Sequence, residues 1–400
     1  MKKRIYLAIG IFIILILLTL WAYILFFGTP DLIKDRFGNF NTDSEPILDE
    51  DTIDNETEIN DDEGETDSRI PLRQISTSPV AGFDFIDVVN NEGGIERVVT
   101  HIYFIKSGTG HIYKYDIENR ERNRISNITI QNTQSGFFTP DGKKAVAVVN
   151  NGFNNRTLTL IDISHTGASN ITSEISGHID NITMSEHGNL FYTKRNNDGG
   201  IHAISLNLES LEEEILFTFP LYQVKVAWGP NEDDSHYIYE RPAPTITSSV
   251  YEVKNNSIRR TNISGYDLQL ITNGNEVAYS MLEIPEQITT RISEYKAENF
   301  TIPLFTSIFS DKCTFVLNES IVCAIQSNKE TSYTGWSKGT YKTNDIFIEI
   351  SLDYETKRDL FSPLQLIKQE LDVYSLQISL SGHIGFLNRL DNGLLWLYSF

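Results

Sequence analysis

The chemistry-bearing residues of this chain include a serine motif near its C-terminal end. Gly335-Trp336-Ser337-Lys338-Gly339 matches the pattern G-x-S-x-G. Serine hydrolases place that serine on a strand-to-helix elbow, and their acid and histidine follow later in an α/β sheet. Here the motif falls in a predicted loop between two strands, we expect no helix after it, and 61 residues remain. We therefore interpret the match as coincidental and assign no catalytic residue.

Histidine and cysteine spacing gives no metal site. The eight histidines are scattered along the chain, and no H-x-x-x-H or C-x-x-C pair occurs. Such pairs are the usual sequence signature of zinc ligands. The acidic stretch around Gly64 lacks the ligand spacing of a calcium loop, and phosphate-loop and dinucleotide motifs are absent. The sequence therefore predicts no metal and no cofactor.

Three glutamates could support glycoside chemistry. Glu240, Glu283 and Glu286 lie near predicted strand ends, where they could approach the axis of a ring of sheets. A paired-carboxylate mechanism needs two acids about 5–10 Å apart, one of them with a raised pKa. An envelope glycan hydrolase or lyase is therefore our alternative hypothesis.

Binding residues are expected on four long loops. These loops are Arg195–Gly200, Arg241–Ser248, Leu282–Thr290 and Gln326–Asn344. Function on β scaffolds tends to lie on such loops, and aromatic residues with arginine are typical interface anchors. The candidates are Arg241, Pro242, Glu283, Tyr333, Trp336 and Tyr341. The sequence leaves two alternatives open, because these aromatics either bind a partner or cover their own sheet.

The two cysteines fall on one predicted hairpin. Cys313 and Cys323 are symmetric about Asn318 in CTFVLNESIVC, so they face each other across two strands. An oxidising compartment permits a disulfide between them, whereas cross-strand geometry is only marginal for one. A cross-strand disulfide and two buried thiols are both consistent with this spacing.

A repeated turn and strand positions these residues. FTPDGKKAVAV at Phe138 recurs as MSEHGNLFYT at Met184, WGPNEDDSHYIY at Trp228 and LITNGNEVAYS at Leu270, with two weaker copies after them. The equivalent turn residues are 46, 44, 42, 45 and 63 residues apart. A period of about 40–50 residues with β-type segments is typical of a β-propeller with one four-stranded sheet per repeat.

Counting strands predicts seven sheets in residues 70–400. The second strands are Val99–Ile105, Ala145–Asn150, Leu190–Lys194, His236–Glu240, Glu276–Met281, Ser320–Ile325 and Ile384–Asn388. The third strands are His111–Tyr115, Leu158–Ile163, Ile201–Leu206, Ser249–Val253, Arg291–Tyr295, Asp345–Ile350 and Leu394–Tyr398. We expect an all-β, seven-bladed β-propeller closed by an N-terminal strand near Ile70–Thr77, which spares the last sheet an open edge.

The N-terminus predicts one membrane-spanning helix. Lys2, Lys3 and Arg4 precede an uncharged run, Ile5–Phe27, of 23 residues. As a helix this run spans about 34 Å, enough for a bilayer core of about 30 Å. It is too long for a signal-peptide core and lacks a small-residue cleavage site. We expect residues 1–27 to form a cytoplasmic stub and an anchor in the lipid bilayer, with the rest outside the cytoplasm.

Charge divides the remaining chain into a tether and a folded part. Thirteen acids and no base lie between Asp43 and Asp67, so residues 28–69 are expected to form an acidic, disordered linker. Of the net charge of −21, residues 68–400 carry −11. A nucleic-acid-binding surface needs clustered positive charge, so nucleic acid is not an expected partner.

Several segments resemble known families. The FTPDGKK repeat resembles TolB-like and WD-repeat-like propellers, although no Trp-Asp dipeptide ends a repeat. LRQISTSPVAGFDF, SGTGHIYKYDIENRERNRISN and SDKCTFVLNESIVCAI resemble uncharacterised single-pass envelope proteins of candidate-phylum bacteria. This resemblance implies a membrane-anchored propeller without an established activity. Our leading hypothesis is a non-enzymatic binding or scaffolding module of the cell envelope with a protein partner.

Overall fold

The computed structural model describes ten segments of the chain. They are residues 70–92, 95–152, 155–163, 169–284, 287–294, 301–304, 309–316, 319–327, 333–352 and 356–399. All lie in one compact unit, residues 66–400. The predicted anchor and tether lie outside the described residues. Within the described segments, no helix has both the length and the apolar character needed to cross a membrane.

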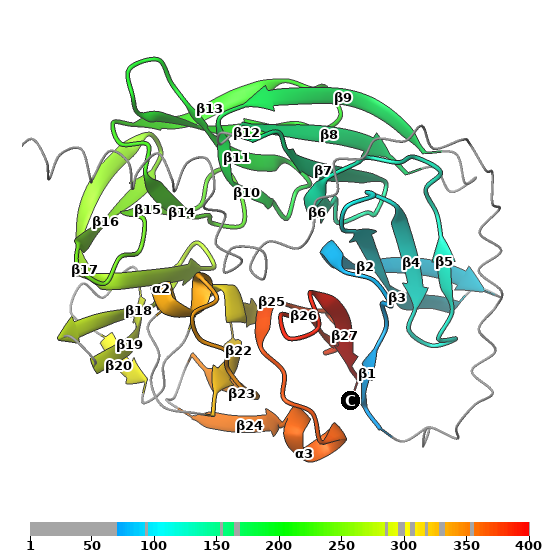
Figure 1. The fold of residues 1–400 in the computed structure, drawn as a ribbon. Coiled ribbons are helices and arrows are strands. Elements are labelled where there is room, and N and C mark those ends of the chain that lie inside the picture. Colours follow the sequence, from blue (N-terminus) through cyan, green and yellow to red (C-terminus); the bar gives the residue numbers. More distant parts are fainter. Residues whose placement is uncertain are drawn as a thin grey trace, which may run out of the picture. The chain divides into compact units, whose positions relative to one another are not determined.

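The described strands form six antiparallel sheets that follow one another around a common centre (Figure 1). The first sheet contains β2 (Val80–Glu92), β3 (Ile95–Lys106), β4 (Ile112–Asp116) and β5 (Arg122–Arg124). The second contains β6 (Thr133–Phe138), β7 (Lys144–Asn150), β8 (Arg156–Asp162) and β9 (Asn170–Gly177). The third contains β10 (Ile179–Met184), β11 (Leu190–Arg195), β12 (Ile201–Leu206) and β13 (Glu213–Phe219).

The fourth sheet has seven strands and the last two have four each. The fourth contains β14 (Val224–Ala227), β15 (His236–Glu240), β16 (Thr247–Lys254), β17 (Ser257–Thr272), β18 (Glu276–Ile284), β19 (Gln287–Glu294) and β20 (Thr301–Leu304). The fifth contains β21 (Cys313–Val316), β22 (Ser320–Gln326), β23 (Asp345–Ser351) and β24 (Lys357–Phe361). The sixth contains β25 (Val373–Ile378), β26 (Ile384–Asn388), β27 (Leu394–Tyr398) and β1 (Leu72–Gln74).

The propeller therefore has six sheets in its described part, and the prediction of seven was wrong. The difference lies in β17, which is 16 residues long. Its first half pairs with β16 from Ser257 to Tyr266, and its second half pairs with β18 from Tyr266 to Thr272. One continuous strand thus joins two predicted repeats into a single sheet, although each predicted second and third strand has a counterpart.

The N-terminal strand closes the last sheet, as predicted. β1 pairs antiparallel with β27, and Leu72, Arg73 and Gln74 lie opposite Tyr398, Leu397 and Trp396. This pairing gives β27 a partner on its outer side, so the strand is not left with unpaired backbone groups at a sheet edge.

The hydrophobic core lies between neighbouring sheets. Alternating apolar residues of one sheet pack against those of the next, as Val146 and Leu158 pack with Leu190 and Tyr192. The inner strands β2 and β6 come close together at two glycines. A Cβ atom on Gly82 would lie 2.0 Å from the carbonyl oxygen of Gly136, so only glycine fits there.

Strand order defines two faces of the propeller. Each four-stranded sheet runs from its first strand to its fourth through antiparallel neighbours, so the first-to-second and third-to-fourth turns share one end. We call this end the turn face. The second-to-third loops and the connections to the next sheet share the other end, which we call the loop face. Tight turns on the turn face carry glycines with positive φ, such as Gly142 at 67° and Gly188 at 83°.

Short helices interrupt the connections around the fifth sheet. A 3-10 turn η2 (Ser310–Lys312) precedes β21, and helix α3 (Pro363–Ile367) lies between β24 and β25. Helix α2 (Tyr333–Ser337) lies in the connection from β22 to β23. The sequence predicted a loop there, so the helix containing Trp336 and Ser337 corrects that expectation.

Candidate functional site

The connection between β22 and β23 organises the loop face. Its described residues, Ser327 and 333–344, include α2 and three of the predicted binding residues. At the base of this connection, both the backbone N–H and the hydroxyl of Ser327 donate to the carbonyl oxygen of Asn344, each at 2.8 Å. The two ends of the segment are therefore held together where it leaves the sheet.

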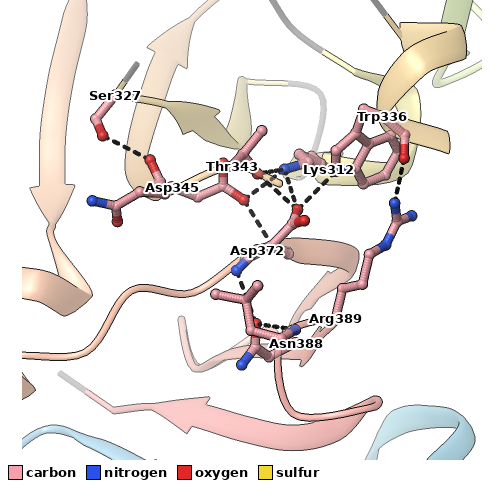
Figure 2. A network of polar contacts seen from close by, with 11 residues as sticks. Lys312, Ser327, Trp336, Thr343, Asp345, Asp372, Asn388 and Arg389 are labelled. Atoms are coloured by element: carbon pink, nitrogen blue, oxygen red, sulfur yellow. Dashed lines mark hydrogen bonds and ion pairs between the residues drawn. The ribbon is translucent and has the colours of Figure 1, made fainter. Parts of the chain in front are cut away.

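A buried ion network lies under this connection (Figure 2). The Lys312 ammonium group donates to Asp345 Oδ2 at 2.6 Å, to Asp372 Oδ1 at 3.0 Å and to Thr343 Oγ1 at 2.5 Å. The network is solvent-excluded, because Lys312 is 1% exposed and both aspartates are 0% exposed. Lys312 ends η2, Asp345 begins β23 and Asp372 immediately precedes β25, so the network joins the fifth and sixth sheets.

Two residues of the connection reach the same carboxylate oxygen. Trp336 Nε1 and Thr343 Oγ1 each donate to Asp372 Oδ1 at 2.7 Å. The Trp336 ring also lies between two cations, with Lys312 Nζ 4.7 Å and the Arg389 guanidinium carbon 4.1 Å from its centroid. Arg389 additionally donates to the Trp336 carbonyl oxygen at 2.5 Å. These contacts fix both ends of the segment between Trp336 and Thr343.

The two aspartates differ in the direction in which their pKa values are shifted. Burial raises the pKa of Asp345 above its usual value, and the pull of Lys312 offsets this only in part. Burial also favours the neutral form of Asp372, but Lys312, Trp336 and Thr343 outweigh it and lower the pKa of that carboxyl. One ammonium group cannot fully stabilise two buried carboxylates. The pKa values of the two carboxyls are therefore shifted in opposite directions, that of Asp345 upward and that of Asp372 downward.

Helix α2 also bonds to the neighbouring fourth sheet. The backbone N–H of Thr334 donates to Asp267 Oδ2 at 3.1 Å, and its hydroxyl donates to Asp267 Oδ1. Tyr333 donates to Asp311 Oδ2 at 2.7 Å, and burial together with the Asp311 charge raises the pKa of this phenol. Helix α2 thus contacts residues of three consecutive sheets, a position that Figure 1 shows near β17 and β25.

The segment beyond α2 projects into solvent. All six residues from Ser337 to Lys342, which we call the loop tip, are exposed. Backbone bonds order it locally, because Gly339 N donates to Trp336 O and Thr340 N donates to Gly335 O, both at 2.9 Å. Gly339 ends the helix with a φ of 74°, a conformation that glycine adopts without strain. The arrangement presents a fixed, polar tip above a buried base.

The serine motif has a local structural role in this geometry. Ser337 Oγ donates to the carbonyl oxygen of Thr334 at 3.1 Å, within the same helix. Gly339 ends helix α2 with its positive φ, as described above. The contacts of the motif are thus those of a short helix and its C-terminal cap.

The predicted binding residues fall into two groups. Trp336 and Tyr333 are only 1% and 7% exposed, so these two aromatics cover their own sheet. Tyr341 is 46% exposed in the loop tip, and Arg241 is exposed and forms an ion pair with Asp180. Pro242 lies beside the connection, since Thr334 Oγ1 approaches its carbonyl oxygen at 3.5 Å. The structure brings Pro242 and the three aromatics to one region of the loop face.

The predicted paired glutamates are not brought together by any described contact. Glu240 Oε2 accepts the backbone N–H of Ser249 at 2.9 Å, within its own sheet. The side chain of Glu283 and all of Glu286 lie outside the described residues. The paired-carboxylate hypothesis therefore stays a prediction. Among the residues that the structure describes, no group of three or more His, Cys, Asp or Glu side chains is arranged to hold a metal ion.

The sequence left a disulfide and two free thiols open as alternatives for Cys313 and Cys323. In this structure the two cysteines form a disulfide. The two residues lie directly opposite each other on β21 and β22. Because β21 follows Lys312 without a break, the disulfide fixes the strand that carries the ion network to its neighbour. It therefore supports the base of the loop face from the inner side of the fifth sheet.

Sequence reasoning missed the residues that hold the site together. Lys312, Asp345 and Asp372 lie at the edges of strands, in the positions that exposed residues usually take. Asp345 and Asp372 are 33 and 60 residues from Lys312, and these separations follow no motif. One signal was present, because each of the three residues immediately precedes or begins an apolar strand of the fifth or sixth sheet.

Comparisons with known proteins support the fold. No protein-family model matches the sequence, and no curated protein matches it. An oligogalacturonate lyase from Vibrio parahaemolyticus is 9% identical, with a TM-score of 0.51 over 80% of this chain and 98% of the lyase. The β-propeller domain of the Trilobed protease from Pyrococcus furiosus is 10% identical, with a TM-score of 0.49 over 80% of this chain and 96% of that domain.

TolB from Acinetobacter baumannii is also similar, at 12% identity and a TM-score of 0.42 over 70% of this chain and 80% of TolB. The likeness to the lyase, at 9% identity and a TM-score of 0.51, concerns the fold alone. With the sheet order described above, the chain has an all-β propeller fold. The resemblance to envelope proteins of candidate-phylum bacteria stays a prediction.

Proposed function

We propose that this chain is a membrane-anchored, extracytoplasmic binding or scaffolding module of the cell envelope, and that its loop face binds a protein partner. The observation that carries the proposal is the convergence of Trp336 and Thr343 on one oxygen of Asp372. This convergence holds the exposed loop tip in one conformation before any partner arrives. A preorganised segment loses less conformational entropy on binding, which favours affinity.

The direction of the closing strand supports the same face. Ser399 N donates to the carbonyl oxygen of Pro71 at 2.9 Å, and Leu72 lies opposite Tyr398 at the end of β27. β27 ends at the turn face, so β1 begins there. The predicted tether therefore joins the propeller at the turn face, and the loop face lies at the opposite end of the sheets.

Site-specific photocrosslinking in the full-length chain tests this proposal. A photoreactive phenylalanine analogue at Tyr341 samples the loop face, and the same analogue at Leu380 samples the turn face, where Leu380 is 73% exposed. We expect a discrete protein adduct from Tyr341 in the native cell and none from Leu380. Buried Trp336 is unsuitable as a probe site, because its replacement would disturb folding.

A second variant tests whether binding depends on the conformation of the loop tip or only on the exposed side chain of Tyr341. Thr343→Val removes one donor to Asp372 and loosens one end of the loop tip while leaving Tyr341 in place. We expect this variant to lower the yield of the Tyr341 adduct. Equal adducts from both probe positions, or none from Tyr341, would refute the loop face as the binding face.

A further inference from the structure

The loop tip has a charge opposite to that of the domain that carries it. Residues 68–400 carry a net charge of −11, whereas Ser-Lys-Gly-Thr-Tyr-Lys from Ser337 contains two lysines and no acid. Within the described part of the chain, neither Lys338 nor Lys342 forms an ion pair. Their charges are therefore available to a partner.

The adjacent loop adds apolar surface without adding negative charge. Residues 241–246 read Arg-Pro-Ala-Pro-Thr-Ile and contain no acid, and Ile246 is 60% exposed. This loop neighbours α2, because Thr334 Oγ1 approaches Pro242 O at 3.5 Å and Asp267 N donates to Ala243 O at 2.9 Å. Tyr341 is 46% exposed in the loop tip and Ile246 is 60% exposed in this loop, so each of the two segments carries one exposed apolar group.

We infer that this surface of the loop face binds an acidic polypeptide segment that also carries apolar side chains. The inference rests on the proposed function and names the chemistry of its partner. Carboxylates of the segment pair with Lys338 and Lys342, and its apolar side chains pack on Tyr341 and Ile246. Complementary charge of this kind mainly sets specificity and association rate.

Other anionic partners fit the surface less well. A nucleic acid needs a wider basic footprint than two lysines provide. An anionic membrane gains only about 1 kcal/mol for each basic residue near its surface. A peptide chain is the partner that uses both the charges and the apolar groups.

The neighbouring arginine provides an internal comparison. Asp180 pairs with Arg241 and also with Arg156, whose Nη1 lies 2.9 Å from Asp180 Oδ1. The charge of Arg241 is thus already partly neutralised within the protein. We expect Lys338 and Lys342 to contribute more to the attraction of an acidic segment than Arg241 does.

Fluorescence anisotropy with the purified full-length chain tests the inference. The probe is a short synthetic peptide of glutamate and phenylalanine. Its comparators replace glutamate with lysine, or phenylalanine with glycine, and phosphatidylglycerol vesicles test a lipid surface. We expect the glutamate–phenylalanine peptide to bind, both altered peptides to bind more weakly, and added salt to weaken binding, because exposed charges are screened.

Charge reversal at the loop tip is the decisive variant. We expect Lys338→Glu with Lys342→Glu to weaken peptide binding about tenfold or more, because two attractions become repulsions. The matched control reverses Lys143 and Lys357, which are exposed on the turn face, and we expect a change of less than about twofold. Arg241→Gln should likewise change affinity less than about twofold.

The outcomes separate this inference from the proposed function. Unchanged peptide affinity after reversal at the loop tip, or binding of vesicles without binding of the peptide, overturns the acidic-segment inference. If the Tyr341 crosslink persists in the reversed variant, the loop face still binds a partner, though of another chemistry. If the crosslink is also absent from the unaltered chain, both proposals fail.

Discussion

Two kinds of connection in the propeller, four turns of the turn face and the α2 connection of the loop face, are held by contacts of different range. Each of the four turns is closed by a side chain within the same turn. The acceptors are Asp116, Asp141, Asn207 and Asn273, each bonded to backbone N–H groups two or three residues away. In the α2 connection on the loop face, contacts join residues far apart in sequence, such as Thr334 with Asp267 and Trp336 with Arg389.

This difference in range has a physical consequence. A turn closed by its own aspartate or asparagine forms wherever the local sequence allows it, and its loss affects little else. The loop face forms only when three sheets are already in place to supply its partners. We therefore expect substitutions in the loop-face network to lower the free energy of unfolding strongly and to disturb the loop tip as well. We expect substitutions in the turns of the turn face to lower it little and to leave the loop tip unchanged.

The largest expected effect comes from Lys312. Lys312→Met removes the cation while two fully buried aspartates remain, and breaking a buried ion pair in this way costs about 3–5 kcal/mol. We expect the free energy of unfolding to fall by that amount in urea titrations. The loop tip should also become more susceptible to proteolysis, because Thr343 and Trp336 then share an unneutralised acceptor.

A double variant tests whether the unpaired charge causes the loss. Lys312→Met with Asp345→Leu removes the acid whose pKa burial already raises. We expect it to be more stable than Lys312→Met alone, although the N–H of Val373 loses its acceptor. A double variant that is less stable than the single one would show that packing, and not charge, dominates the network.

The next effect concerns His236, a buried imidazole that closes a turn. His236 Nδ1 accepts the N–H of Gly229 at 3.0 Å, and its ring packs against Phe191, Phe217 and Trp228. Burial lowers the pKa of His236 to about 4, although Glu232 and Asp234 act against this shift. The folded protein therefore keeps this imidazole neutral where an unfolded chain would protonate it.

The sign of the resulting pH dependence follows directly. Between the ordinary histidine pKa of 6.5 and about 4, the unfolded state binds a proton that the folded state does not. The free energy of unfolding therefore decreases as the pH falls through this window, by at most about 3 kcal/mol. His236→Phe should show a shallower decrease in urea titrations. Parallel decreases in both proteins would mean that His236 is protonated in the fold.

The same contrast in range explains what the sequence could predict. Alternating apolar residues and turn glycines are local signals, and they placed the strands around Gly142 and Gly188 correctly. The closing strand was also predictable, because the segment from Leu72 resembles an outer strand of the first sheet. The number of sheets could not be predicted from such local signals. Ser264-Gly265-Tyr266-Asp267 resembles a turn, whereas β17 continues through it because strands on both sides pair with it.

The candidate site shows the same limit. Trp336 and Tyr333 stand in a polar loop, and no neighbouring residue indicates whether they are exposed. Their burial depends on Asp372, Asp311 and Asp267, which lie 36, 22 and 67 residues from their partners. Tyr341 has no such contact in the described residues and is 46% exposed, and its role as a binding residue stays a prediction.

The smallest expected effect tests the local character of the turn face. Asp141 Oδ1 accepts the Thr139 hydroxyl at 2.7 Å and the N–H of Lys143 at 3.1 Å, and half of its side chain is exposed. Asp141→Ala should lower the free energy of unfolding by only about 0.5–1.5 kcal/mol, the usual net value of such hydrogen bonds. Asp141→Asn keeps an acceptor oxygen and should lose less. Neither change should alter the proteolysis of the loop tip. A loss as large as that of Lys312→Met, or a loosened loop tip, would mean that the turn face is coupled to the ring as strongly as the loop face.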